Sequence, residues 1–344
     1  MQTNASRRDL AKAFAFMAAA SAAGPALAQS APAAPANVDA AVKAAHAEFK
    51  GLNEGKNADY IPALAQVPSN YFGIGLVTPT NKSSFVGDIE PKFSIQSISK
   101  VFTLALVFQE SGEALIENSI GVDATGQVFN SITAVEQYKG KEMNPFVNPG
   151  AIATTGMVKG GSADEVWRKI LGIHSDFAGR QLDVDQVVYK SEADTNQRNR
   201  AIGQLMSAYE RFPGDPAQAV DLYTRQCAIA VNAKDLAVMA ATLANGGKNP
   251  VTRKQVIDPR HVPGILAVMA TAGLYDDSGK WLFHTGLPAK SGVGGGIIAV
   301  SPGKFGIGTF APPLDAAGNS VRGQRAITSI SNALDGNPYA VRPV

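Results

Sequence analysis

Residues 93–102 read FSIQSISKVF and lead into an apolar run that ends at Gly112. Within this stretch Ser97 and Lys100 are three positions apart, so on a helix their side chains share one face. A serine hydroxyl is a weak nucleophile that needs a base, and a lysine can be that base only when burial or a neighbouring cation lowers its pKa. We therefore expect a half-buried helix over residues 101–110, with a serine nucleophile at its N-terminal end, where the helix dipole favours developing negative charge.

The Ser-x-x-Lys spacing is weak evidence by itself. It recurs in SPGK at residues 301–304, where a turn keeps the two side chains off a common helical face. A second element strengthens the case, because KSGVGGG at residues 290–296 leads into an apolar strand. Serine acyl enzymes with a lysine base combine Ser-x-x-Lys with Lys-[Ser/Thr]-Gly on a strand edge, where backbone N–H groups can face an oxyanion. A glycine-rich bulge is the alternative, but the two motifs together favour a serine acyl-transfer site.

Apolar periodicity places strands at both ends of the chain and helices between them. Strands are expected over residues 71–78, 83–89, 283–290, 297–301 and 305–311. Helices are expected over residues 38–52, 163–171, 197–210, 217–226, 233–244 and 319–334. This order predicts an α/β fold of the α+β type: a mainly antiparallel sheet flanked by helices, plus an inserted all-helical domain, with the site in the cleft. Residues 38–112 and 263–344 would form the sheet-containing domain, and residues 113–262 the helical one.

The N-terminal segment has the features of an export signal. An Arg-Arg pair at residues 7–8 precedes an alanine-rich apolar stretch, and ALA at residues 26–28 has the small-x-small form that signal peptidases accept. We expect a twin-arginine signal peptide over residues 1–28, a Pro/Ala linker over residues 29–37, and a periplasmic protein. A disordered arm or a membrane anchor is the alternative, but an anchor needs about 20 apolar residues.

Composition favours a small-molecule substrate over a polymer or a membrane. The chain has 31 basic and 29 acidic residues, and it lacks the basic stripe that nucleic acid or an anionic membrane requires. The single cysteine, Cys227, cannot form a disulfide within the chain. The four histidines show no metal-binding spacing. We expect neither a metal nor a cofactor.

Several separate stretches resemble the bacterial glutaminase family, which is related to the serine β-lactamases and DD-peptidases. They are residues 93–102, 148–153, 191–201 and 223–236, GLPAKSGVGGGIIA at residues 286–299, and NSVRG at residues 319–323. The stretches fall in the family's order and spacing from about residue 38 to residue 333. The resemblance implies a β-lactamase-like fold, hydrolysis of L-glutamine to L-glutamate and ammonia without a cofactor, and a homodimer or homotetramer.

The resemblance also implies a role for each matching position. Ser97 would be the nucleophile, Lys100 its general base, and the backbone N–H groups of Ser97 and Val293 the oxyanion hole. Tyr275 would relay a proton between these groups and the departing ammonia. The substrate would be bound by Tyr60, Gln96, Ser97, Asn148, Glu192, Asn199, Tyr223, Tyr275 and Val293.

The chemistry of glutamine agrees with these residue types. Its ammonium, carboxylate and side-chain amide call for one anion, several neutral donors and a nucleophile. Glu192 would pair with the ammonium, although a charge at the start of a helix after Ser191 is the alternative. The Asn and Tyr side chains can donate to the carboxylate without bringing a competing charge. Tyr275 lies near two lysines in this scheme, and we expect them to acidify its phenol.

Two positions depart from the family pattern, and two other functions remain open. Pro149 stands where alanine is usual, which removes an N–H beside Asn148 and could alter carboxylate binding. Ala228 stands where serine is usual, inside a helical segment, where we expect it to affect packing alone. A β-lactamase or penicillin-recognising acyl transferase would share both motifs, but no clear Ser-Asp-Asn element is present. A non-catalytic amino-acid binder could keep the same pocket.

Overall fold

The computed structural model describes residues 37–341 of the chain. The predicted signal peptide, and all but the last residue of the predicted linker, lie outside this range. No helix within it is both long enough and apolar enough to cross a bilayer.

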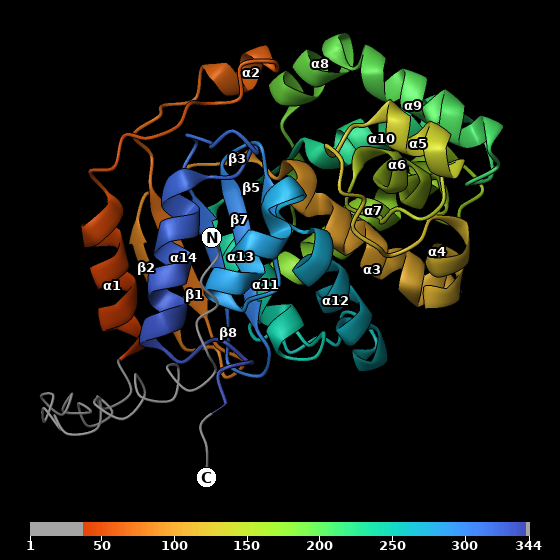
Figure 1. Ribbon diagram of the computed structural model, residues 1–344. Helices are drawn as coiled ribbons and strands as arrows, with labels where there is room; N and C mark the ends of the chain where they lie inside the picture. Colours follow the sequence, from red (N-terminus) through yellow and green to blue (C-terminus); the bar gives the residue numbers. More distant parts are fainter. Residues whose placement is uncertain (1–36, 342–344) are drawn as a thin grey trace, which may run out of the picture. The chain divides into compact units, whose positions relative to one another are not determined.

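Five antiparallel strands from the two ends of the chain form the main sheet (Figure 1). The strands are β1 (Gly73–Val77), β2 (Ser83–Gly87), β6 (Ala289–Gly292), β7 (Gly296–Ser301) and β8 (Phe305–Phe310). Their spatial order is β2-β1-β8-β7-β6. The N-terminal hairpin joins the C-terminal strands through β1 and β8, where Leu76 lies opposite Ile307.

Helices cover both faces of this sheet. On one face, α1 (Val38–Phe49) and α14 (Val321–Ala333) pack side by side and bury Val42 and Ile327 against the strands. On the other face, α11 (Ala233–Ala244) crosses β8 at very short range. A Cβ on Gly306 or Gly308 would lie 2.1 or 2.4 Å from a backbone nitrogen of α11, so the repeated glycines of β8 permit this contact.

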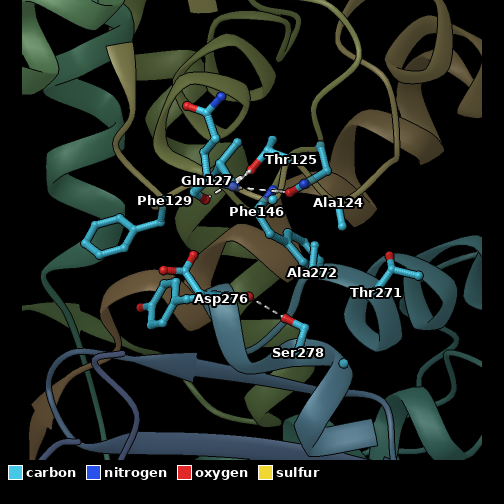
Figure 2. A pocket seen from close by; sticks show the side chains of 14 residues that line it. Ala124, Thr125, Gln127, Phe129, Phe146, Thr271, Ala272, Asp276 and Ser278 are labelled. Carbon is cyan, nitrogen blue, oxygen red and sulfur yellow. Dashed lines mark hydrogen bonds between the residues drawn. The ribbon is translucent and has the colours of Figure 1, made fainter. Parts of the chain in front are cut away.

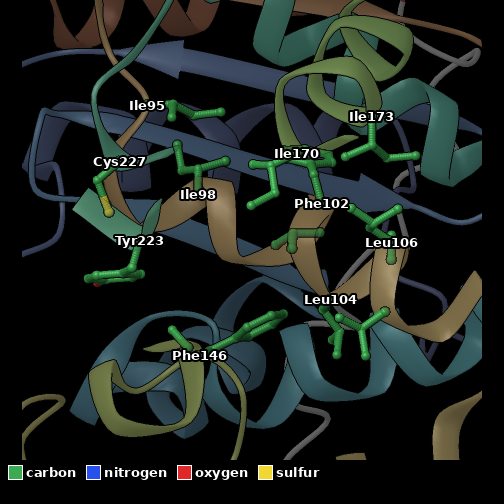
Figure 3. Close-up of a cluster of buried hydrophobic side chains, with 14 of the residues drawn as sticks. Ile95, Ile98, Phe102, Leu104, Leu106, Phe146, Ile170, Ile173, Tyr223 and Cys227 are labelled. Atoms are coloured by element: carbon green, nitrogen blue, oxygen red, sulfur yellow. The ribbon is translucent and has the colours of Figure 1, made fainter. Parts of the chain in front are cut away.

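Helix α3 (Ser99–Ser111), whose residues from Ser99 to Phe108 are all buried, packs against α4 (Glu113–Ser119), α6 (Asn148–Gly156), α7 (Ala163–Ala178) and α12 (Val262–Ala272). The remaining helices are α2 (Pro62–Ala65), α5 (Ile132–Tyr138), α8 (Gln186–Thr195), α9 (Gln197–Ala208), α10 (Pro216–Cys227) and α13 (Ser278–Thr285). Figure 3 shows Phe102 of α3 in this core with Ile170 and Ile173 of α7. The core thus holds rigidly the helix that follows the predicted nucleophile.

A second, three-stranded sheet joins α3 to the helical region. Its strands β3 (Phe93–Ser94), β5 (Ile229–Val231) and β4 (Asp183–Val184) lie in that order. The chain passes from β3 directly into the short 3-10 helix η1 (Gln96–Ile98) and then into α3. Pairing of β3 with a strand more than a hundred residues later therefore fixes the start of the segment that carries Ser97.

The structure confirms the predicted α+β architecture and corrects one strand. Residues 283–285, placed in a strand by sequence, belong to α13, and β6 begins only at Ala289. The helix buries Trp281 and ends at Gly286, whose φ of +68° is a left-handed cap. The layers also cross the predicted domain boundaries, because α11 packs on the sheet and α3 packs among the helices.

Candidate active site

Ser97 lies in η1, at the point where the small sheet passes into α3. The residue before it, Gln96, has a φ of +51°, in the left-handed region that side chains rarely adopt. Ser97 is buried and lines a cavity of about 170 Å³. The sharp backbone turn thus directs the serine into a small enclosed space.

Lys100 is fully buried in the first turn of α3, one turn beyond Ser97. Its Nζ donates hydrogen bonds to Phe146 O at 3.0 Å and to Asn148 Oδ1 at 2.8 Å, and the described residues give it none to the Ser97 hydroxyl. Burial lowers the pKa of Lys100 to about 8, although the neighbouring Cys227 and Glu192 oppose this shift. A neutral amine is therefore accessible near neutral pH, as a lysine base requires.

Asn148, at the start of α6, connects Lys100 to the wall of the cavity. Its Oδ1 also accepts from the Tyr223 hydroxyl at 3.1 Å, and its Nδ2 donates to Asn199 Oδ1 at 3.1 Å. Asn148 and Tyr223 thus have donors engaged within the protein, which leaves Asn199 Nδ2 and the Tyr60 hydroxyl as the freer donors of the predicted set. Tyr60 is 56% exposed, at the mouth of the cavity.

Pro149 fits the first turn of α6 without losing a hydrogen bond. The N–H groups in the first turn of a helix have no intrahelical acceptor, so the missing N–H leaves no gap in the ladder. Gly150 is the more constrained neighbour, because a Cβ there would lie 2.0 Å from Asn144 O. The local backbone gives no structural reason to expect the proline to disturb the site.

Glu192 projects from α8 into the cavity and is only 7% exposed. Its Oε2 accepts a hydrogen bond from Gln96 Nε2 at 3.2 Å, and no basic side chain among residues 37–341 forms an ion pair with it. Burial raises the pKa of Glu192 to about 7, while the Gln96 hydrogen bond and Lys100 partly offset this. A buried carboxylate without a cation partner is suited to binding a positively charged ligand. This favours the ligand-binding role of Glu192 over the alternative of a charge at the start of a helix.

The turn between β6 and β7 approaches the nucleophile closely. A Cβ on Gly292 or Gly294 would lie 2.7 Å from the backbone oxygens of Ile95 or Ser94, so glycine is needed at both positions. Among the described residues, neither the Ser97 N–H nor the Val293 N–H donates a hydrogen bond within the chain. Two free amides beside a buried serine hydroxyl fit the predicted oxyanion hole.

Tyr275 lies in the short 3-10 helix η3 (Tyr275–Asp277) with a φ of +53°. Its hydroxyl hydrogen-bonds with the Ser97 side chain and lies 3.5 Å from Ser291 O. Burial raises the pKa of Tyr275 to about 12, although its hydrogen bond with the Ser97 side chain partly offsets this. The prediction that neighbouring lysines acidify the Tyr275 phenol was wrong. Lys290 Nζ lies 4.3 Å from the Tyr275 ring centroid, but burial also lowers the pKa of Lys290 and so weakens the effect of its charge on the phenol.

The structure brings together every residue of the predicted site. Eight of them line the cavity, with Lys100 and Tyr275 directly behind Asn148 and Ser97. The cavity is also lined by Ile61, Phe129, Asn130, Thr195, Asn196 and Arg198, which sequence reasoning missed. Arg198 Nε donates to Asn130 O at 3.0 Å and joins α9 to the loop after α4. In the sequence, the position of Arg198 next to Asn199 was the one indication that it could line the cavity. Within residues 37–341 no cluster of potential metal ligands occurs.

Comparison with known proteins agrees with this geometry. The family model described as Glutaminase matches residues 55–339. A glutaminase of Colwellia psychrerythraea is 52% identical over 86% of this chain and 95% of its own length. A glutaminase of Mycobacterium ulcerans is 48% identical over 87% of this chain and 93% of its own.

Solved structures give the same result. A structure described as probable glutaminase YbaS superposes with a TM-score of 0.87 at 45% identity, covering 88% of this chain and 98% of that one. A probable glutaminase of Bacillus subtilis superposes with a TM-score of 0.78 at 28% identity, covering 87% and 95%. The likeness extends over nearly the whole length of these proteins, and the chain belongs to the glutaminase family.

Proposed function

We propose that this protein hydrolyses L-glutamine to L-glutamate and ammonia through a glutamyl ester on Ser97, with Lys100 as the general base. The observation that carries this proposal is the cavity itself, in which Ser97 and the unpaired carboxylate of Glu192 line one enclosed space. A related structure described as Mglu in its glutamate form, 35% identical to this chain, supports the same class of ligand.

In the proposed complex the ammonium of glutamine pairs with Glu192, and the Tyr60 hydroxyl and Asn199 Nδ2 donate to its carboxylate. The side-chain amide then points away from the mouth, toward Ser97. The Glu192 carboxyl, with a pKa of about 7, ionises fully once a cation lies beside it, so substrate charge and site charge reinforce each other.

Acylation begins when neutral Lys100 takes the proton of Ser97 and the Ser97 oxygen attacks the amide carbon. The oxyanion accepts hydrogen bonds from the N–H groups of Ser97 and Val293. The carbon–nitrogen bond breaks as the nitrogen receives a proton from Tyr275, and the tyrosine oxygen then takes back the proton held by Lys100. Tyr275 can donate because its raised pKa keeps the phenol protonated.

Deacylation again uses Lys100 as the base. A water molecule gives a proton to Lys100 as its oxygen bonds to the ester carbon, and the bond to Ser97 breaks as that proton returns to the serine. Glutamate leaves and the neutral amine of Lys100 is restored.

Ammonia release from L-glutamine by the purified protein tests this proposal, with Ser97→Ala as the inactive control. L-asparagine as comparison substrate measures selectivity for chain length, and a chromogenic β-lactam tests the rival acyl transferase. Loss of activity in Ser97→Ala would establish the nucleophile. A folded wild-type protein that is inert on glutamine and forms no covalent adduct with an electrophilic glutamine analogue would be a binder.

We propose further that the protein is exported to the periplasm by the twin-arginine route and forms a homodimer or homotetramer. The arginine pair and alanine-rich stretch described above support export. Fusing residues 1–28 to a fluorescent reporter, with the pair at residues 7–8 changed to two lysines as control, tests it. Light scattering after chromatography measures the assembly.

A further inference from the structure

A second pocket of about 160 Å³ (Figure 2) is lined by Tyr275 and shares Phe129 with the candidate site. It is lined by the loop after α4 and by the region that joins α12 to α13. The lining residues are Ala124, Thr125, Gly126, Gln127, Phe129, Asn144, Phe146, Val147, Thr271, Ala272, Tyr275, Asp276, Ser278 and Gly279. Asp276 is the one carboxylate among them, and none is basic.

Phe129 and Tyr275 form the wall between this pocket and the substrate cavity. Phe129 lines both spaces, and its ring centroid lies 4.8 Å from that of Tyr275. The Tyr275 ring lines the second pocket, while its hydroxyl bonds with the Ser97 side chain on the catalytic side. Phe146 also lines this pocket, and its carbonyl accepts a bond from Lys100. The pocket is thus bounded by Tyr275, the proposed proton donor, and by Phe146, whose carbonyl orients the proposed base Lys100.

The orientation of glutamine in the proposed complex gives this pocket a use. With Tyr60 holding the substrate carboxylate near the mouth, the amide nitrogen is released at the inner end of the cavity, beside Tyr275. The glutamyl chain, esterified to Ser97, then fills the path back to the mouth. We propose that ammonia leaves, and the hydrolytic water enters, through the second pocket past the Phe129–Tyr275 ring pair.

This inference rests on the proposed function and adds no new chemical step. The nitrogen leaves as neutral NH₃ after the carbon–nitrogen bond breaks and one proton has been transferred to it. In the second pocket NH₃ takes a proton from water, and the ammonium so formed is attracted to the exposed carboxylate of Asp276. Separate routes for glutamate and ammonia reduce re-attack of NH₃ on the ester.

Filling the pocket with Gly279→Leu tests this route. Gly279 lies in α13 without a positive φ, and a Cβ there meets no atom within 4 Å. Gly172→Leu is the matched control, since Gly172 lies in α7, has equally open space and does not line the pocket. Thr271→Trp, on α12, fills the pocket from another helix and guards against a folding defect in the first variant.

The readout is incorporation of [¹⁵N]ammonium into glutamine, which reports access of ammonia to the acyl-enzyme, measured beside hydrolysis. We expect both rates to fall about tenfold in Gly279→Leu and Thr271→Trp, with the KM for glutamine unchanged because the substrate cavity is intact. Gly172→Leu should match the wild type.

Exchange and hydrolysis at wild-type rates in both pocket variants would overturn the route and leave the proposed function standing. A rise in KM equal to the loss of rate would also overturn it, because it would indicate damage to the substrate cavity. Absence of glutamine hydrolysis in the wild-type protein would instead refute the proposed function.

Discussion

Lys100 Nζ donates a hydrogen bond to Asn148 Oδ1 at 2.8 Å, although the two residues come from different helices. The partner is a neutral amide and not a carboxylate, so it orients the amine without supplying the opposite charge that would hold it protonated. Burial then dominates and the pKa of Lys100 falls to about 8. The absence of an ion pair therefore lets burial set the protonation state of Lys100, and that state is measurable.

Activity should rise with pH in two steps. Glu192, with a pKa of about 7, must ionise to bind the ammonium, and Lys100, with a pKa of about 8, must lose its proton to act as a base. We expect kcat/KM, which reports the free enzyme, to show both steps between about pH 6 and pH 9. The profile of kcat should keep only the lysine step, because the bound ammonium lowers the pKa of Glu192. Initial rates across this range check it, and a kcat that is flat above about pH 6 would argue against Lys100 as the base.

Lys100→Met should abolish activity and change how stability depends on pH. The pKa of Lys100 lies near 8 in the folded protein and at its ordinary value of 10.5 in the unfolded chain. The unfolded chain therefore binds more protons between these values, and wild-type stability rises with pH there. The buried lysine therefore lowers the free energy of unfolding by about 3 kcal/mol below about pH 8, and this effect disappears above pH 10.5.

The measurement is urea unfolding of both proteins at about pH 7 and about pH 10. Loss of the two hydrogen bonds of Lys100 lowers the stability of the variant equally at both pH values, so the change in the difference is the informative quantity. Between these two pH values, we expect the free energy of unfolding of the wild type to rise by about 2 kcal/mol more than that of the variant. An unchanged difference would mean that the lysine is charged when folded.

Glu192→Gln should weaken glutamine binding more than it slows turnover. The amide keeps the size of the side chain but removes the charge that pairs with the ammonium, and a charged hydrogen bond contributes about 1.5–3 kcal/mol. We expect KM to rise about 10-fold to 100-fold with a much smaller change in kcat. Asp194→Asn is the control, since it removes an exposed charge from the same helix. Equal effects of the two substitutions would exclude a direct role for Glu192.

Tyr275→Phe should lower kcat while leaving substrate affinity nearly intact. The variant keeps the ring contact with Phe129 and the position over Lys290, and it loses only the hydroxyl that bonds with Ser97. A positioned general acid contributes about 10²-fold to 10⁴-fold, so a loss of kcat in this range is expected. Steady-state kinetics with glutamine checks it. A kcat within about threefold of wild type would show that Lys100 protonates the leaving group directly.

The sequence was most informative where the chemistry is local. Ser97 and Lys100 stood out because their helical spacing occurs together with a second motif, and the glycines of residues 290–296 marked the close approach of a strand edge. Strands β1, β7 and β8 of the main sheet were also predictable, since each is a β-rich run bounded by turn residues. The prediction of a strand over residues 283–285 failed because Trp281 and the cap at Gly286 favour one more helical turn.

Contacts between distant segments could not be read from the sequence. Strands β3 and β4 have two residues each, too few to show periodicity, yet β3 positions Ser97 by pairing with β5. Phe129 comes from a loop without a motif and reaches the cavity only through the fold. The direction of the Tyr275 pKa shift was missed because burial depends on packing and not on which lysines are near.

The left-handed backbone at Gln96 and Tyr275 has a consequence for laboratory evolution. These two residues flank the Ser97 side chain, and each such conformation costs of order 1–3 kcal/mol in a residue other than glycine. A library screened for heat resistance alone should therefore enrich glycine or asparagine at both positions. Such clones would survive heating and lose the amide that contacts Glu192 or the phenol that contacts Ser97. Selection on this protein needs an activity filter at every round, because stabilising substitutions at these two positions would remove groups of the candidate site.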